Sequence, residues 1–200
     1  MKTSETHQML LNIGAIAQHE AAHCVAALAS GFDAHQISLH YQLYPQAHRG
    51  KAYADYNIRC DSLTELHDLM TKKVVIALSG AMGEAIDRST FKVNAITAYK
   101  ILDEGATGAS QDFAVAKELV NLIHNSSPVT ADAETGKDST SVDLLRFLLE
   151  AALRLVESNA KQICMIADAL VKKVVEGKGI GELQRDDIEQ LLTPPEASAP

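Results

Sequence analysis

The stretch LLNIGAIAQHEAAHCVAAL at residues 10–28 decides which fold this 200-residue chain is expected to adopt. Its apolar side chains recur at the three- and four-residue spacing of a helix: Leu10, Ile13, Ile16, Val25 and Leu28. The helix is predicted to begin within residues 3–5 and to end at Gly31. Thr3 or Ser4 can cap its start. Because much of this helix is apolar, polar groups on it are expected to be partly buried.

Within this helix, residues 19–23 read His-Glu-Ala-Ala-His. Two imidazoles four residues apart lie on one helical face, and the carboxylate of Glu20 can reach a water molecule at a shared metal ion. Catalytic zinc sites use three protein ligands and leave a fourth position for water. The pattern is therefore typical of a zinc hydrolase. Taken alone, it also fits an accident in a helical structural protein, with His19 and His23 as ordinary core histidines.

The rest of the sequence predicts one mainly helical domain over residues 1–192 and a disordered tail at residues 193–200. A small β-hairpin or sheet is expected near residues 35–58, because apolar and polar residues alternate from residue 37 to residue 43. Its turn is placed at residues 45–50. Further helices are expected over residues 62–88, 94–102, 110–124, 142–176 and 185–192.

Several local features accompany these elements. Residues 74–86 are apolar nearly all round, so their helix should be central. Ser110 is a good helix cap, residues 125–141 form a long polar loop, and residues 177–181 form a Gly-rich turn. The histidines outside the pentapeptide and near the hairpin are expected to be solvated surface residues: His35, His40 and His48.

Composition narrows the function classes. A net charge of −8, 4% aromatic residues and no Trp argue against nucleic-acid binding. No apolar run approaches the roughly 18 residues of a membrane span, and the polar start of the chain does not resemble a secretory signal. The cysteines are three in number and form no CxxC pair, so they are expected to be reduced: Cys24, Cys60 and Cys164. A cytoplasmic protein is predicted.

A third metal ligand must come from outside the helix that carries His19 and His23. Two acidic residues stand out among the candidates. Glu84 lies within the apolar segment of the central helix, where a carboxylate needs a partner. Asp112 lies near the start of a helix, directly after a Gly-rich turn. Residue patterns alone leave both candidates open.

Three ordered pieces of the chain resemble one known family. QHEAAH at residues 18–23, LSGAMGEAI at residues 78–86 and TGASQDF at residues 107–113 are similar to motifs of the peptidase domain in FtsH-type membrane-associated AAA proteases. The strand at residues 35–39 and the C-terminal helices also look similar, so the resemblance spans most of residues 8–192. It implies a zinc metallopeptidase domain.

The resemblance also implies a role for each matching residue. His19, His23 and Asp112 match the family's zinc ligands, and Glu20 matches its general base. Glu84 matches a residue that orients a ligand histidine. Glu20 would accept a proton from water activated by the metal as that water attacks a peptide carbonyl. The strand at residues 37–43, if it lies at an exposed sheet edge, could hold an extended peptide by strand addition.

The chain departs from the family pattern in several places. Ala22 replaces a Gly and could narrow the space beside the metal, while Ala81 and Gln111 replace an Arg and an Asn. No GxxxxGK[ST] motif occurs, so the chain carries no P-loop ATPase, and the family's membrane segments are missing. The expected function is a stand-alone zinc metallopeptidase acting on peptides or unfolded segments. The alternative is a zinc-binding, non-hydrolytic module that docks on or regulates a partner; a homo-oligomer or a separate ATPase partner is possible in either case.

Overall fold

The computed structural model of the chain describes residues 2–42, 47–104, 108–127 and 140–193, and its side chains from Thr6 onward. The predicted disordered tail, most of the polar loop and part of the hairpin turn lie outside these residues. The helices are α1 (Lys2–Ala29), α2 (Leu63–Glu84), α3 (Ala95–Glu104), α4 (Ala109–Ser126), α5 (Ser141–Ser158), α6 (Ala160–Glu176) and α7 (Arg185–Leu192). The strands are β1 (Asp33–Gln42), β2 (Ala47–Asp55), β3 (Ile86–Asp87), β4 (Lys92–Val93) and β5 (Ile180–Gln184).

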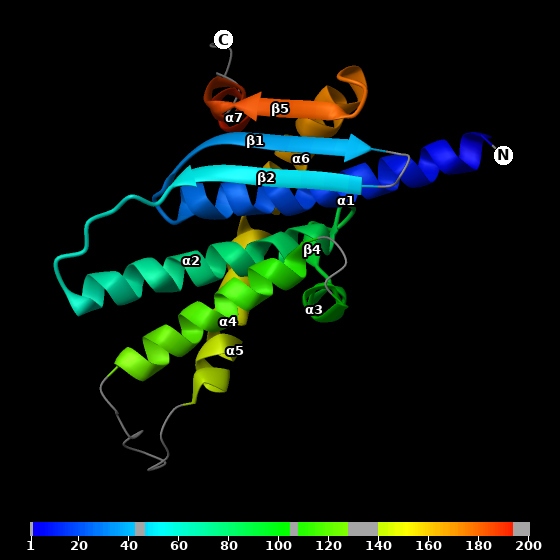
Figure 1. Cartoon of the computed structure of the whole chain (residues 1–200). Helices are drawn as coiled ribbons and strands as arrows, with labels where there is room; N and C mark the ends of the chain where they lie inside the picture. Colours follow the sequence, from blue (N-terminus) through cyan, green and yellow to red (C-terminus); the bar gives the residue numbers. More distant parts are fainter. Residues whose placement is uncertain (1, 43–46, 105–107, 128–139, 194–200) are drawn as a thin grey trace, which may run out of the picture.

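The predicted fold class is confirmed: the chain is mainly helical with a small antiparallel sheet. The long helix α1 lies between the sheet on one side and the helices α2 and α4 on the other (Figure 1). α6 packs against α1 and against the sheet strands β1 and β5. No helix in the described part of the chain has the length and apolar character needed to cross a bilayer.

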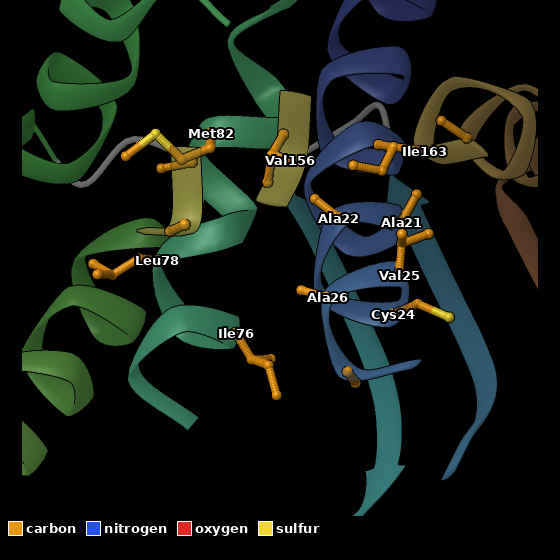
Figure 2. Close-up of a cluster of buried hydrophobic side chains, with 14 of the residues drawn as sticks. Ala21, Ala22, Cys24, Val25, Ala26, Ile76, Leu78, Met82, Val156 and Ile163 are labelled. Carbon is orange, nitrogen blue, oxygen red and sulfur yellow. The ribbon is translucent and has the colours of Figure 1, made fainter. Parts of the chain in front are cut away.

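Small residues on α1 allow its close packing against α2. Figure 2 shows Ala22 and Ala26 on the side of α1 that faces α2, whereas Cys24 and Val25 point away from that helix. On α2, Gly83 lies so close to α1 that a β-carbon at this position would overlap the methyl group of Ala22. The two helices can therefore carry side chains to a common point between them.

The sheet contains a strand, β5, that the sequence did not predict. β1 pairs with β2 and also with β5, so β1 is the central strand and β2 is an edge strand. The strand expected at residues 37–43 is therefore not an edge over its described residues 37–42, so the condition for strand addition there is not met. The Gly-rich turn predicted at residues 177–181 runs directly into β5, where Leu183, opposite Ile37 of β1, is buried in the core.

Other boundaries differ for local reasons. α1 begins at Lys2, so Thr3 and Ser4 lie within the helix rather than at its cap. The cap of α4 is Gly108 rather than Ser110, and its φ of 99° is one that glycine adopts without strain. The helix predicted over residues 142–176 is broken at Asn159, whose side-chain amide donates a hydrogen bond to the carbonyl oxygen of Leu155 at 2.8 Å.

α2 is shorter than predicted. It ends at Glu84, and the next residues, which were expected to continue the helix, pair as the short strand β3 with β4. The helix keeps the central place predicted for it, since its residues 74–76 and 78–83 are buried. Its last residue, Glu84, therefore lies beside His19 of α1.

Candidate metal centre

The buried middle of α1 presents His19 and His23 to the side facing α2 and α4. The four-residue spacing places His19 and His23 one helical turn apart, and their rings meet edge to face with centroids 4.7 Å apart. His19 is 2% exposed and Glu20 is 8% exposed, so both polar groups are held inside the protein. Buried polar groups of this kind need partners from other elements.

α4 supplies one of those partners. Asp112 lies in the first turn of α4, where a carboxylate is favoured by the helix dipole. Its Oδ2 atom is 3.1 Å from His19 Nε2 and 3.3 Å from His23 Nε2. The two Nε2 atoms are themselves 3.0 Å apart. The two Nε2 atoms and Asp112 Oδ2 are three potential metal-binding atoms, and they form a compact triangle. Asp112 comes 93 residues after His19 and 89 residues after His23 in the sequence.

The partner of the other ring nitrogen, Nδ1, indicates whether the Nε2 atom of each histidine carries a proton. His23 Nδ1 donates a hydrogen bond to the carbonyl oxygen of Ile76 on α2, at 2.8 Å. His19 Nδ1 faces the carboxylate of Glu84 at 3.4 Å, an ion-pair distance rather than a well-formed hydrogen bond. Both partners are acceptors, so they favour the tautomer with the proton on Nδ1. If both histidines are neutral, their Nε2 lone pairs point at each other and at the anionic Oδ2 atom of Asp112. These electron-rich atoms repel one another, so a cation is needed between them.

The close contacts among these groups shift the pKa values of His19 and Asp112. Burial alone would lower the pKa of His19, but its contacts with Asp112 and Glu84 outweigh burial and raise that pKa to about 9. Burial alone would raise the pKa of Asp112, but its contacts with His19 and His23 outweigh burial and lower it. In the absence of a metal, a proton on His19 therefore supplies the missing positive charge near neutral pH.

The triangle fits a zinc ion. In a tetrahedral site with ligand distances of about 2.0–2.1 Å, neighbouring ligand atoms are about 3.3 Å apart. The three distances here, 3.0, 3.1 and 3.3 Å, are close to that value. Two imidazole nitrogens and one carboxylate oxygen are also ligands that zinc accepts, and three protein ligands leave one position open. His19, His23 and Asp112 would hold the ion.

A cavity of about 380 Å³ opens beside this centre. Its walls come from α1, from the edge strand β2, from α2 and from the start of α4. Gly50 of β2 contacts Glu20 so closely that a β-carbon at residue 50 would overlap the Glu20 carboxylate. The backbone of the edge strand therefore runs directly past the carboxylate that follows the first histidine.

The structure brings together the five residues singled out in the sequence: His19, Glu20, His23, Glu84 and Asp112. Ala22 is not among the residues that line the cavity, because its methyl group packs against Gly83. The expectation that Ala22 narrows the space beside the metal is therefore wrong. His48 is exposed, as predicted, but it lines the cavity.

Sequence reasoning missed the contribution of β2 and of Lys73 to the cavity. No local signal identifies them, because the edge position of β2 follows from the pairing of β1 with β5, which are about 140 residues apart in the chain. Searches of protein-family models and of curated proteins found no match to the sequence. The chemistry of the centre must therefore be inferred from its geometry.

Proposed function

We propose that this protein is a zinc-dependent metallopeptidase that hydrolyses peptide bonds in peptides or unfolded segments. The observation that carries the proposal is the convergence of the His19 and His23 Nε2 lone pairs on Asp112 Oδ2, in a cavity that the carboxylate-bearing residue Glu20 also lines. The resemblance of three ordered motifs to the peptidase domain of FtsH-type proteases supports the same reading.

Each residue of the centre has a role in this reaction. A zinc ion bound there would polarise the peptide carbonyl and lower the pKa of the attacking water. Glu20 accepts the proton of that water and later delivers it to the leaving amine nitrogen. Glu84 and the carbonyl of Ile76 hold the two imidazoles in the orientation in which their Nε2 atoms are ligands.

The edge strand offers a way to hold the substrate. In the described sheet β2 pairs with β1 alone, which leaves its other side free to pair with an extended peptide. Since Gly50 contacts Glu20, a peptide added beside β2 would pass the general base with its backbone extended. Only an unfolded segment or a short peptide can adopt this conformation, which agrees with the substrate class proposed.

Metal analysis combined with peptide hydrolysis tests the proposal. Wild-type protein should hold close to one zinc per chain and cleave denatured protein. Glu20→Gln should keep the zinc and lose hydrolysis, whereas His19→Ala and Asp112→Ala should lose both. Glu118→Gln, the same change at an exposed site on α4, is the matched control and should behave as wild type. Unchanged hydrolysis by Glu20→Gln or His19→Ala would show that the active site is assigned wrongly.

The same experiment addresses the alternative function. Stoichiometric zinc without hydrolysis of any denatured protein would favour a zinc-binding module that docks on or regulates a partner. We further propose that the protein acts in the cytoplasm, since Cys24, Cys60 and Cys164 are free thiols. Because the chain has no P-loop motif, folded substrates would require a separate ATPase partner, and light scattering would show whether the chain forms a homo-oligomer.

A further inference from the structure

Three basic residues are among those that border the cavity beside the candidate metal centre. Arg49 and Lys51 come from β2, and Lys73 comes from α2. The acidic residues that line the same cavity are Glu20 and Asp112, and both belong to the centre itself. In a chain with a net charge of −8, three basic residues gathered beside one cavity stand out.

These three cations have no acidic partner in the described part of the chain. Lys51 Nζ lies 4.3 Å from the ring centroid of Tyr53, and Lys73 Nζ lies 5.1 Å from that of Tyr56. Both ammonium groups therefore lie over aromatic rings, which attract them without offering a negative charge. The neighbouring Lys72, which does not line this cavity, pairs with a carboxylate at 2.8 Å.

Arg49 and Lys51 lie where their side chains could contact a peptide that pairs with β2 as an additional strand. Successive side chains of a strand point to opposite faces of its sheet. Gly50 faces Glu20, so Arg49 and Lys51, on either side of it, belong to the other face. In an extended peptide paired with β2, side chains on that face would lie about 5 Å from Arg49 and Lys51, within reach of an ion pair.

We propose that the substrate is an acidic peptide, with Asp or Glu close to the bond that is cleaved, on the face of the added strand that Arg49 and Lys51 share. The inference rests on the proposed peptidase function and adds its specificity. Arg49 and Lys51 bind carboxylates on the outer face of the added strand. Lys73, on the opposite wall of the cavity, attracts a carboxylate that enters beside the centre. Opposite charges on the partners also speed their encounter, an effect that salt weakens.

Hydrolysis of matched peptides tests this specificity. Three fluorogenic peptides would share one sequence except for Glu, Gln or Lys at the two positions on each side of the central bond. We expect kcat/KM for the Glu peptide to exceed that for the Gln peptide at least tenfold at low salt, and the ratio to fall as NaCl is added. Arg49→Gln, Lys51→Gln and Lys73→Gln should each lower the ratio severalfold. Lys72→Gln, the same change one residue outside the cavity, should leave it unchanged.

A peptide-binding measurement distinguishes failure of the acidic specificity from failure of the proposed peptidase function. Zinc-loaded Glu20→Gln protein would be titrated with the same three peptides, fluorescently labelled, and followed by anisotropy. Tighter binding of the Glu peptide, without hydrolysis of any peptide by the wild type, would refute the peptidase function but support the acidic ligand. Efficient cleavage or binding of the Gln and Lys peptides, with no preference for Glu, would overturn the acidic specificity even if the peptidase function holds.

Discussion

Gly80 of α2 lies directly against the imidazole of His19: a β-carbon at position 80 would stand 2.5 Å from His19 Nε2. The same atom would stand 2.5 Å from His23 Nε2. Any side chain at this position would therefore enter the space between the two nitrogens that face Asp112. The absence of a side chain at Gly80 is thus a requirement of the centre and not of the helix, which glycine destabilises.

Gly80→Ala should abolish stoichiometric zinc binding while the protein stays folded, because the new methyl group must displace one of the two imidazoles. Zinc content by elemental analysis and helix content by circular dichroism measure the two effects separately. Gly14→Ala on α1 is the matched control, since a β-carbon there meets no atom within 4 Å. Wild-type zinc content in Gly80→Ala would contradict the position assigned to the metal.

Zinc affinity should rise with pH. The pKa of His19 is raised to about 9 in the metal-free protein, so zinc must displace a proton at any lower pH. We expect the affinity to increase about tenfold per pH unit between pH 7 and 9 and to level off above it. Competition with a chromophoric chelator at several pH values measures this dependence, and an affinity that is constant from pH 7 to 9 would refute it.

The stability of the metal-free protein should follow the opposite trend. His19 has a raised pKa, so its contribution is complete below its ordinary value of 6.5 and is lost as the pH rises to about 9. Asp112 has a lowered pKa, so its contribution is complete above its ordinary value of 3.8 and is lost under more acidic conditions. Urea denaturation in the presence of a chelator should give a higher unfolding free energy at pH 5.5 than at pH 9. In His19→Gln this difference should shrink.

Glu84→Gln should weaken zinc binding by about 10–100-fold, the usual effect of removing a group that orients a ligand histidine. The substitution keeps the size of the side chain but removes the charge that faces His19 Nδ1. Glu118→Gln serves again as the exposed control. If the dissociation constant for zinc is the same in Glu84→Gln and in the wild type, Glu84 has no part in the centre.

Ala22 and Gly83 should behave as a coupled pair. A methyl group at position 83 would overlap that of Ala22 and come within 2.8 Å of the Gln18 carbonyl oxygen. Gly83→Ala should therefore lower the free energy of unfolding by about 1–3 kcal/mol. In the double variant Ala22→Gly, Gly83→Ala, part of this loss should be recovered, because the first overlap is relieved. Strictly additive effects in chemical denaturation would show that the two residues are not in contact.

Local patterns in the sequence were enough to predict most of the helical segments, though not all of their ends, and the alignment of His19 with His23, which follows from the geometry of one helix. Asp112 could not be selected in this way. Its distance from the histidines depends on how α4 packs against α2, and Glu84 satisfied the same residue-level criteria. The resemblance to a known family favoured Asp112, and the structure places Glu84 on the far nitrogen of His19.

The order of strands in the sheet could not be predicted from local sequence patterns. Alternation of apolar residues identified β1, but it carries no information on which neighbours a strand has. β5 was hidden because Gly179 and Gly181 are typical of a turn, although Leu183 is buried as a strand residue should be. Because β5 was not predicted, β1 was considered a possible edge strand. The actual edge strand, β2, was assigned no functional role.

The pairing of β1 with β5 also has a consequence during synthesis of the protein. It joins residues as distant as Gln36 and Gln184, so one side of the central strand has no partner until residue 184 has left the ribosome. During that interval, β1 offers unpaired backbone groups to any other chain nearby. His19, His23 and Asp112 are all present much earlier. The residues of the candidate metal centre are therefore all synthesised before the strand that completes the sheet.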